Sequence, residues 1–121
     1  SIAYVFIVTS VLFGVLAFIG YTTKKDLSNW FTVLFTTLLV GIIASIINLF
    51  IGNTMIDLAI TWIMLILFFG ITVYDMNKLK MLSQDPSLNQ EKLYIYGAME
   101  LYLDFINIFL KLLRIFARSR D

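Results

Sequence analysis

The sequence predicts an all-α, polytopic transmembrane bundle of four helices. Sixty per cent of the 121 residues are hydrophobic and only 14% are charged, whereas a soluble domain has about a quarter charged residues. A chain of this size cannot bury so much apolar surface by folding in water. The apolar residues form four long runs without the alternation typical of a transmembrane barrel. A lipid bilayer is therefore the predicted surrounding of the chain.

The first two runs cover about residues 2–21 and 30–51 and contain no charged residue. Each is close to the ~20 residues that a helix needs to cross ~30 Å of hydrocarbon. Gly52 and Asn53 follow directly, and both residue types tolerate a positive φ. The sequence therefore predicts two spans with a tight turn after the second.

The third run covers about residues 58–76 and includes Asp75 near its end, and the fourth covers about residues 93–116. Between them, Asp85 and Pro86 have the pattern of an N-cap followed by a proline in the first turn of a helix. This pattern predicts that the last helix begins there.

Basic residues in short connectors predict the orientation of the spans. The turn at Gly52 has none, whereas the two polar connectors contain five lysines: Lys24, Lys25, Lys78, Lys80 and Lys92. Both connectors are therefore expected on the cytoplasmic side. A last span that crossed completely would place Arg118 and Arg120 outside, against this rule, so the sequence leaves its crossing open. The chain opens with Ser1 and an apolar run without a signal-peptide pattern, which indicates that earlier residues are missing.

One face of the last span carries a line of polar side chains. At 100° per residue, six of them fall within about 40° of the first: Glu100, Asp104, Asn107, Lys111, Arg114 and Arg118. A charge near the bilayer centre costs about 2.5–3.5 kcal/mol, so this polar stripe cannot face lipid. It must face protein or water, which predicts that the last span is the central helix of its bundle.

Asp104 lies at mid-span, where an ionisable side chain points to function. The structural alternatives are that Glu100 shares a proton with Asp104 or that Lys111 neutralises it. The three basic residues of the polar stripe are expected to extend to the headgroups. Asp75 shares a helix face with Thr72 and belongs either to the same polar seam or to the headgroup level.

The sequence leaves open whether Asp75 and Asp104 meet. Asp75 lies ten residues before Asp85, and Asp104 lies nineteen residues after it. With straight helices, the difference of nine residues is about 13 Å. Contact therefore requires a break, for which Gly97 is the candidate, or a tilted last helix.

Three segments resemble bacterial members of the Bax inhibitor-1 (transmembrane Bax-inhibitor-motif) family. They are GYTTKKDLS at 20–28, TVYDMNKLK at 72–80 and GAMELYLDFINIFLKLLRIF at 97–116. The family has seven helices, and this chain resembles helices four to seven, with the last one central. The resemblance implies a pH-sensitive calcium leak channel of the inner (plasma) membrane, in which Asp75 and Asp104 form a proton-sensing pair.

The resemblance also implies partners: the bilayer, calcium ions and protons, the missing N-terminal helices of the same protein, and a possible membrane protein partner. Calcium would be a permeant ion held transiently by Asp75 and Asp104, beside a polar seam that includes Thr72, and no cofactor is expected. Glu100 and Lys111 are charged where relatives more often have uncharged residues. The family's latch also uses an arginine from an early helix, whereas the first arginine of this chain is Arg114.

Two rival functions remain beside the channel. One is a non-conducting regulator that binds a membrane protease or another membrane partner. The other is an intramembrane aspartyl protease, which would need Gly-x-Gly-Asp at the second acid, whereas Leu101, Tyr102 and Leu103 precede Asp104. We expect no enzyme. The chain has no His or Cys, which excludes the usual zinc ligands and thiol chemistry. A net charge of +1 without a basic block gives no indication of nucleic acid.

Overall fold

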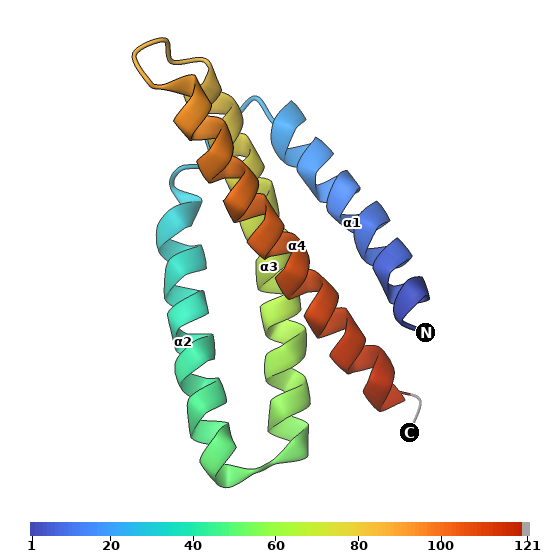
Figure 1. The fold of residues 1–121 in the computed structure, drawn as a ribbon. Coiled ribbons are helices and arrows are strands. Elements are labelled where there is room, and N and C mark those ends of the chain that lie inside the picture. The colour runs from blue at the N-terminus through green and yellow to red at the C-terminus, as the bar shows by residue number, and fades with distance from the viewer. Residues whose placement is uncertain (120–121) are drawn as a thin grey trace.

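The computed structural model describes residues 1–119, apart from the side chain of Ser119. Four α-helices account for nearly all of this part, and it contains no strand, which confirms the all-α prediction. All four helices are long and apolar enough to cross a membrane, as predicted. They are α1 (Ile2–Thr22), α2 (Trp30–Ile51), α3 (Thr54–Ser83) and α4 (Gln90–Ser119) (Figure 1).

The turn between α2 and α3 is the predicted one. Gly52 ends α2 in the left-handed region, at φ 73°, a conformation that costs glycine little. The side chain of Asn53 then caps α3 by accepting from the Ile56 N–H at 3.0 Å. Asn48 brackets the turn, because its amide donates to the Asn53 carbonyl at 3.0 Å. Its side-chain oxygen accepts from the Asn53 N–H at 3.3 Å.

The prediction that Asp85 and Pro86 start the last helix is wrong. The Asp85 carboxylate accepts from the Ser87 hydroxyl at 2.7 Å and from the Ser87 N–H at 3.0 Å. These bonds close a local turn instead of a helix cap, and they hold the pKa of Asp85 below its ordinary value. The helix begins at Gln90, where Asn89 accepts from the Lys92 N–H at 3.2 Å.

The helices alternate in direction, so the connectors α1–α2 and α3–α4 lie at one end and the α2–α3 turn lies at the other (Figure 1). Lys80, in the last turn of α3, ties this end of the helix to the α1–α2 connector, because its ammonium donates to the Thr23 carbonyl at 3.0 Å. Both connectors thus lie at one end, as expected if they share a membrane face. α4 runs back toward the α2–α3 turn (Figure 1) and is long and apolar enough to cross a membrane.

Among these four helices, α3 is the central one, whereas the prediction of a central last helix concerns a bundle of seven helices. α3 contacts α1, α2 and α4, whereas α4 contacts only α1 and α3. Glu100, Arg114 and Arg118 of the stripe on α4 have ionic partners on α3, whereas Asn107 and Lys111 bond within α4. Apolar side chains of α4 such as Tyr102 and Leu110 remain exposed. The buried apolar core lies between α1, α3 and α4 and includes Val5, Leu65 and Ile108.

α1 is held against α3 by a buried amide and by a close backbone approach. Asn77 of α3 is 1% exposed, and its side chain donates to the carbonyls of Gly20, Thr23 and Lys25 at 3.1–3.3 Å. Its oxygen accepts from the Leu27 N–H at 3.3 Å. This one side chain therefore fixes the end of α1 and the following connector on α3.

Gly20 is where the two backbones come together, because a Cβ there would lie 2.5 Å from the Val73 carbonyl oxygen. We expect Gly20→Ala to lower the free energy of unfolding by about 1–2 kcal/mol, since a backbone atom cannot rotate away from the added methyl. Gly14→Ala is the matched control in the same helix, where an added Cβ meets nothing within 4 Å. Thermal unfolding in detergent measures both, and equal stability of the two variants would contradict the close approach.

Candidate functional site

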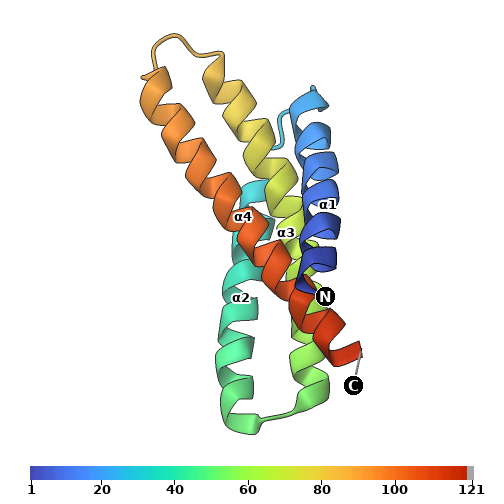
Figure 2. The same cartoon turned by 45° about the vertical axis from the view of Figure 1, so that its right-hand side comes forward.

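The structure brings Asp75 of α3 and Asp104 of α4 together, a point that the sequence left open. The two side chains are only 7% and 4% exposed, and their carboxyl groups lie within hydrogen-bonding reach of each other. Their helices lie against each other, and α4 runs obliquely across α3 (Figure 2). Asp75 is therefore one half of a pair of acids buried between α3 and α4.

The mismatch of about 13 Å between the two positions is closed by two features of α4. Because α4 begins at Gln90, Asp104 lies fourteen residues into the helix instead of nineteen after the turn. The remaining difference is taken up by inclination, since α4 runs obliquely across α3 (Figures 1 and 2). The helix is not broken at Gly97. A Cβ at Gly97 would lie 2.5 Å from Leu79, so this glycine allows the helices to approach closely.

One oxygen of the carboxyl pair lacks a hydrogen-bond donor among the described residues. Asp104 Oδ2 is buried, and no donor among residues 1–119 reaches it. Its neighbouring polar group is the Asp75 carboxyl, which is an acceptor unless it carries a proton. Two ionised carboxylates would repel each other in this low-dielectric setting. A proton shared between Asp75 and Asp104 satisfies the orphan oxygen and removes the repulsion.

The pair opens onto a cavity of about 390 Å³. α2 and α4 do not contact each other, so α3 forms the floor of a groove between them. Lys78 and Glu100 flank the pair on the connector side, with the ammonium 3.2 Å from the carboxylate. The Lys78 ammonium also lies 5.6 Å from the ring of Tyr74 and 5.5 Å from that of Tyr96. The aliphatic side of the cavity is contributed mainly by Leu34, Leu38, Ile71 and Leu103.

The polar stripe of α4 faces α3 and the groove, but its partners are not those considered from the sequence. Glu100 binds Lys78 of α3 and does not pair with Asp104. Lys111 donates to Asn107 Oδ1 at 3.2 Å and does not neutralise Asp104. Thr72 is fully buried and donates to the Phe68 carbonyl of its own helix at 2.7 Å. It is absent from the lining of the cavity.

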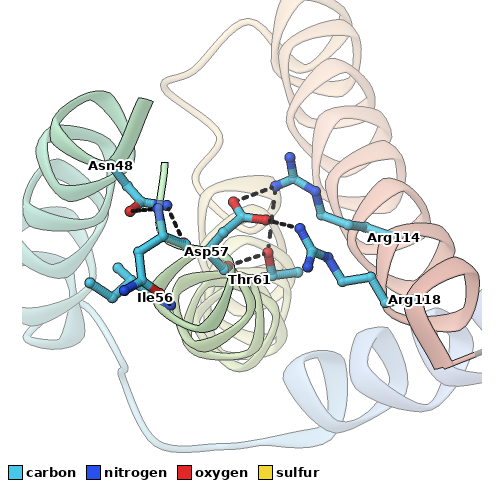
Figure 3. Close-up of polar contacts among 7 residues, drawn as sticks. Asn48, Ile56, Asp57, Thr61, Arg114 and Arg118 are labelled. Carbon is cyan, nitrogen blue, oxygen red and sulfur yellow. Dashed lines mark hydrogen bonds and ion pairs between the residues drawn. The ribbon is translucent and has the colours of Figure 1, made fainter. Parts of the chain in front are cut away.

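A second ionic cluster joins α3 and α4 near the α2–α3 turn (Figure 3). Arg118 donates to Asp57 Oδ2 at 2.6 Å, and Arg114 lies 3.5 Å from the other oxygen of Asp57. Arg114 also reaches the Thr61 hydroxyl at 3.5 Å, and this hydroxyl donates to the Asp57 carbonyl at 2.9 Å. Arg114 and Arg118 thus have a counter-charge on α3.

Asp57 was missed by the sequence analysis because the hydropathy pattern placed it in the turn before the third span. The signal that could have revealed it is the pair Arg114 and Arg118, one helical turn apart on a span with no acid beside them. Asp57 also supplies negative charge to the basic C-terminal part of α4. This part of α4 lies near the α2–α3 turn, which contains no lysine. Arg120, which entered the same argument, lies outside the described residues.

The described residues form no resident metal site. Calcium takes six to eight oxygen ligands in such sites. Within residues 1–119, no three Asp, Glu, His or Cys side chains come together in a way that could hold a metal ion. The buried pair supplies two carboxyl groups, fewer ligands than a resident calcium site uses.

Comparison with known proteins identifies the family of this chain. The model of the family described as "Inhibitor of apoptosis-promoting Bax1" matches residues 1–121. This chain belongs to the Bax inhibitor-1 family. The resemblance found in the sequence motifs is therefore confirmed.

Several curated proteins of the Bax inhibitor-1 family are similar to this chain over nearly its whole length. Inner membrane protein YbhL of Escherichia coli K12 is 44% identical and is matched over 99% of this chain and 53% of its own length. An uncharacterized protein of Rickettsia prowazekii is 36% identical, over 100% of this chain and 52% of its own length. An uncharacterized membrane protein of Streptococcus pyogenes is also 36% identical, over 94% and 50%. The chain thus spans about half the length of these relatives, and the prediction of a multi-pass membrane protein agrees with them.

Proposed function

We propose that this chain is part of a channel of the inner (plasma) membrane that passes cations, calcium among them, under the control of protons. In this proposal Asp75 and Asp104 are the proton sensor, and the groove between α2 and α4 is the route. The observation that carries the proposal is the buried carboxyl pair, which joins two helices and lines the cavity on that route.

The pair can act as a switch because its charge state decides whether α3 and α4 attract or repel each other. With one shared proton, Asp75 and Asp104 are hydrogen-bonded and hold the two helices together. Without it, two unit negative charges about 4 Å apart repel by roughly 4 kcal/mol at an effective dielectric constant of 20. A rise in pH therefore favours separation of α4 from α3 at this level, and a fall in pH favours closure.

An opened pair also offers what a permeant calcium ion needs. Ionised carboxylates are hard oxygen ligands, and a site with two of them binds calcium without enclosing it. Conduction requires this balance, because an ion must enter a site and also leave it. Glu100 lies on the same groove, where Lys78 balances its charge at 3.2 Å.

The remaining helices of the complete protein are proposed to cover this groove. Relatives of the Bax inhibitor-1 family are about twice as long as this chain, and α2 and α4 leave the groove open between them. The relatives from Escherichia coli and Streptococcus pyogenes are named as membrane proteins, and we propose no enzymatic reaction for the buried acids.

Calcium flux from the complete purified protein, reconstituted into liposomes with an entrapped calcium indicator, tests the proposal. We expect flux without any other protein and an increase as the pH is raised. If the purified protein gives no flux at any pH, the channel is refuted and a non-conducting regulator of a membrane partner is favoured. The variants that separate these functions are described in the Discussion.

A further inference from the structure

A second cavity continues the groove toward the α2–α3 turn. It has a volume of about 500 Å³ and is lined by the ionic cluster of Asp57, Thr61 and Arg114 and by apolar residues of α2. Leu38, Phe68 and Asn107 line both this cavity and the one that contains the carboxyl pair. These three side chains therefore mark the boundary between the cavities.

Lys111 lies at this boundary and contacts two of the residues that form it, Asn107 and Phe68. Its ammonium is 3.2 Å from Asn107 Oδ1 and 4.9 Å from the centre of the Phe68 ring, a cation–π distance. No carboxylate among residues 1–119 forms a salt bridge with Lys111. Arg114, three residues further along α4, lines the same second cavity and has the same sign of charge.

We infer that Lys111 is the electrostatic barrier of the route, a fixed positive charge that a cation must pass between the two cavities. The inference rests on the proposed function, because a barrier matters only where ions move along the groove. An uncompensated ammonium repels a divalent cation more than a monovalent one. Lys111 therefore limits the calcium flux even when the carboxyl pair is ionised. It also makes the route less permeable to divalent than to monovalent cations.

Lys111→Cys in the complete protein tests the barrier, because this chain has no cysteine and a single thiol can receive a charge chemically. Any cysteine elsewhere in the protein is first replaced by serine. At a fixed alkaline pH we expect calcium flux about tenfold above wild type, since removing one unit charge a few ångström from the ion lowers the barrier by more than RT. Aminoethyl methanethiosulfonate, which adds an ammonium, should restore the wild-type flux, whereas methyl methanethiosulfonate should leave it high.

Two further variants keep the test decisive. Lys111→Met retains the length of the side chain without its charge and should match the unmodified cysteine variant. Lys92→Cys, at an exposed position in the first turn of α4, should have wild-type flux before and after each reagent. If Lys111→Cys and Lys111→Met both conduct like wild type while Asp104→Asn still removes the pH dependence, the barrier is refuted and the carboxyl-pair proposal stands. Absence of flux from every variant would overturn both.

Discussion

Asp104→Asn in the complete reconstituted protein is expected to give a calcium flux that no longer changes with pH. The asparagine amide can hydrogen-bond to Asp75 without a shared proton, so titration no longer changes the attraction between α3 and α4. For the wild type we expect a rise of about fivefold or more over the titration, the lower end of typical couplings between two sites. Asp75→Asn should have the same effect, because the two carboxyl groups titrate as one unit. Fluorescence of an entrapped calcium indicator over a pH series measures all three proteins.

Asp85→Asn is the matched control for these variants. Asp85 lies outside the membrane-spanning helices, and bonds from Ser87 hold its pKa below the ordinary value, so it remains ionised over the neutral range. Its replacement should leave the pH profile unchanged. A normal pH profile in both Asp75→Asn and Asp104→Asn would refute the buried pair as the sensor.

The second large effect is expected at the ionic cluster at the opposite end of α3 and α4. Asp57→Ala leaves Arg118 and Arg114 without their counter-charge within the span of α4. We expect a loss of about 2–3 kcal/mol in the free energy of unfolding, below the 3–5 kcal/mol typical of fully buried pairs. The reduction reflects solvent screening, because the side chains of Asp57 and Arg118 are 26% and 35% exposed. Thermal and denaturant unfolding in detergent measure the change.

A double-mutant cycle separates the ion pair from other effects of the substitution. Arg118→Ala should cost less than Asp57→Ala, since Arg114 remains near the carboxylate. The double variant should be more stable than the sum of the two single losses predicts, by about 1 kcal/mol or more. Strict additivity would contradict a direct interaction between Asp57 and Arg118.

The sequence predicted the spans and the presence of two intramembrane acids because each depends on local composition. The limits of α1 and α2 follow from uncharged runs that end at polar residues, and the turn at Gly52 follows from its backbone freedom. The limits of α3 and α4 were predicted too short, since hydropathy detects the part of a helix that crosses lipid. Both helices continue into polar residues beyond it.

Partners across two helices were harder to predict than the residues themselves. Glu100 was expected to act within its own helix, yet it binds Lys78, which hydropathy had assigned to the connector. Asp57 was missed for a similar reason, because hydropathy had placed it in the turn before the third span. The contact between Asp75 and Asp104 depends on the inclination of α4 over α3, and the rise per residue along one helix carries no information about a crossing angle.

Infrared spectroscopy of the complete protein tests most directly whether Asp75 and Asp104 share a proton. At mildly acidic pH, where an isolated aspartate is ionised, we predict the C=O stretch of a protonated carboxyl group in the wild type. This band should disappear in the double variant Asp75→Asn/Asp104→Asn and should decrease in the wild type as the pH is raised into the conducting range. A wild-type spectrum with ionised carboxylate bands alone at mildly acidic pH would contradict the account.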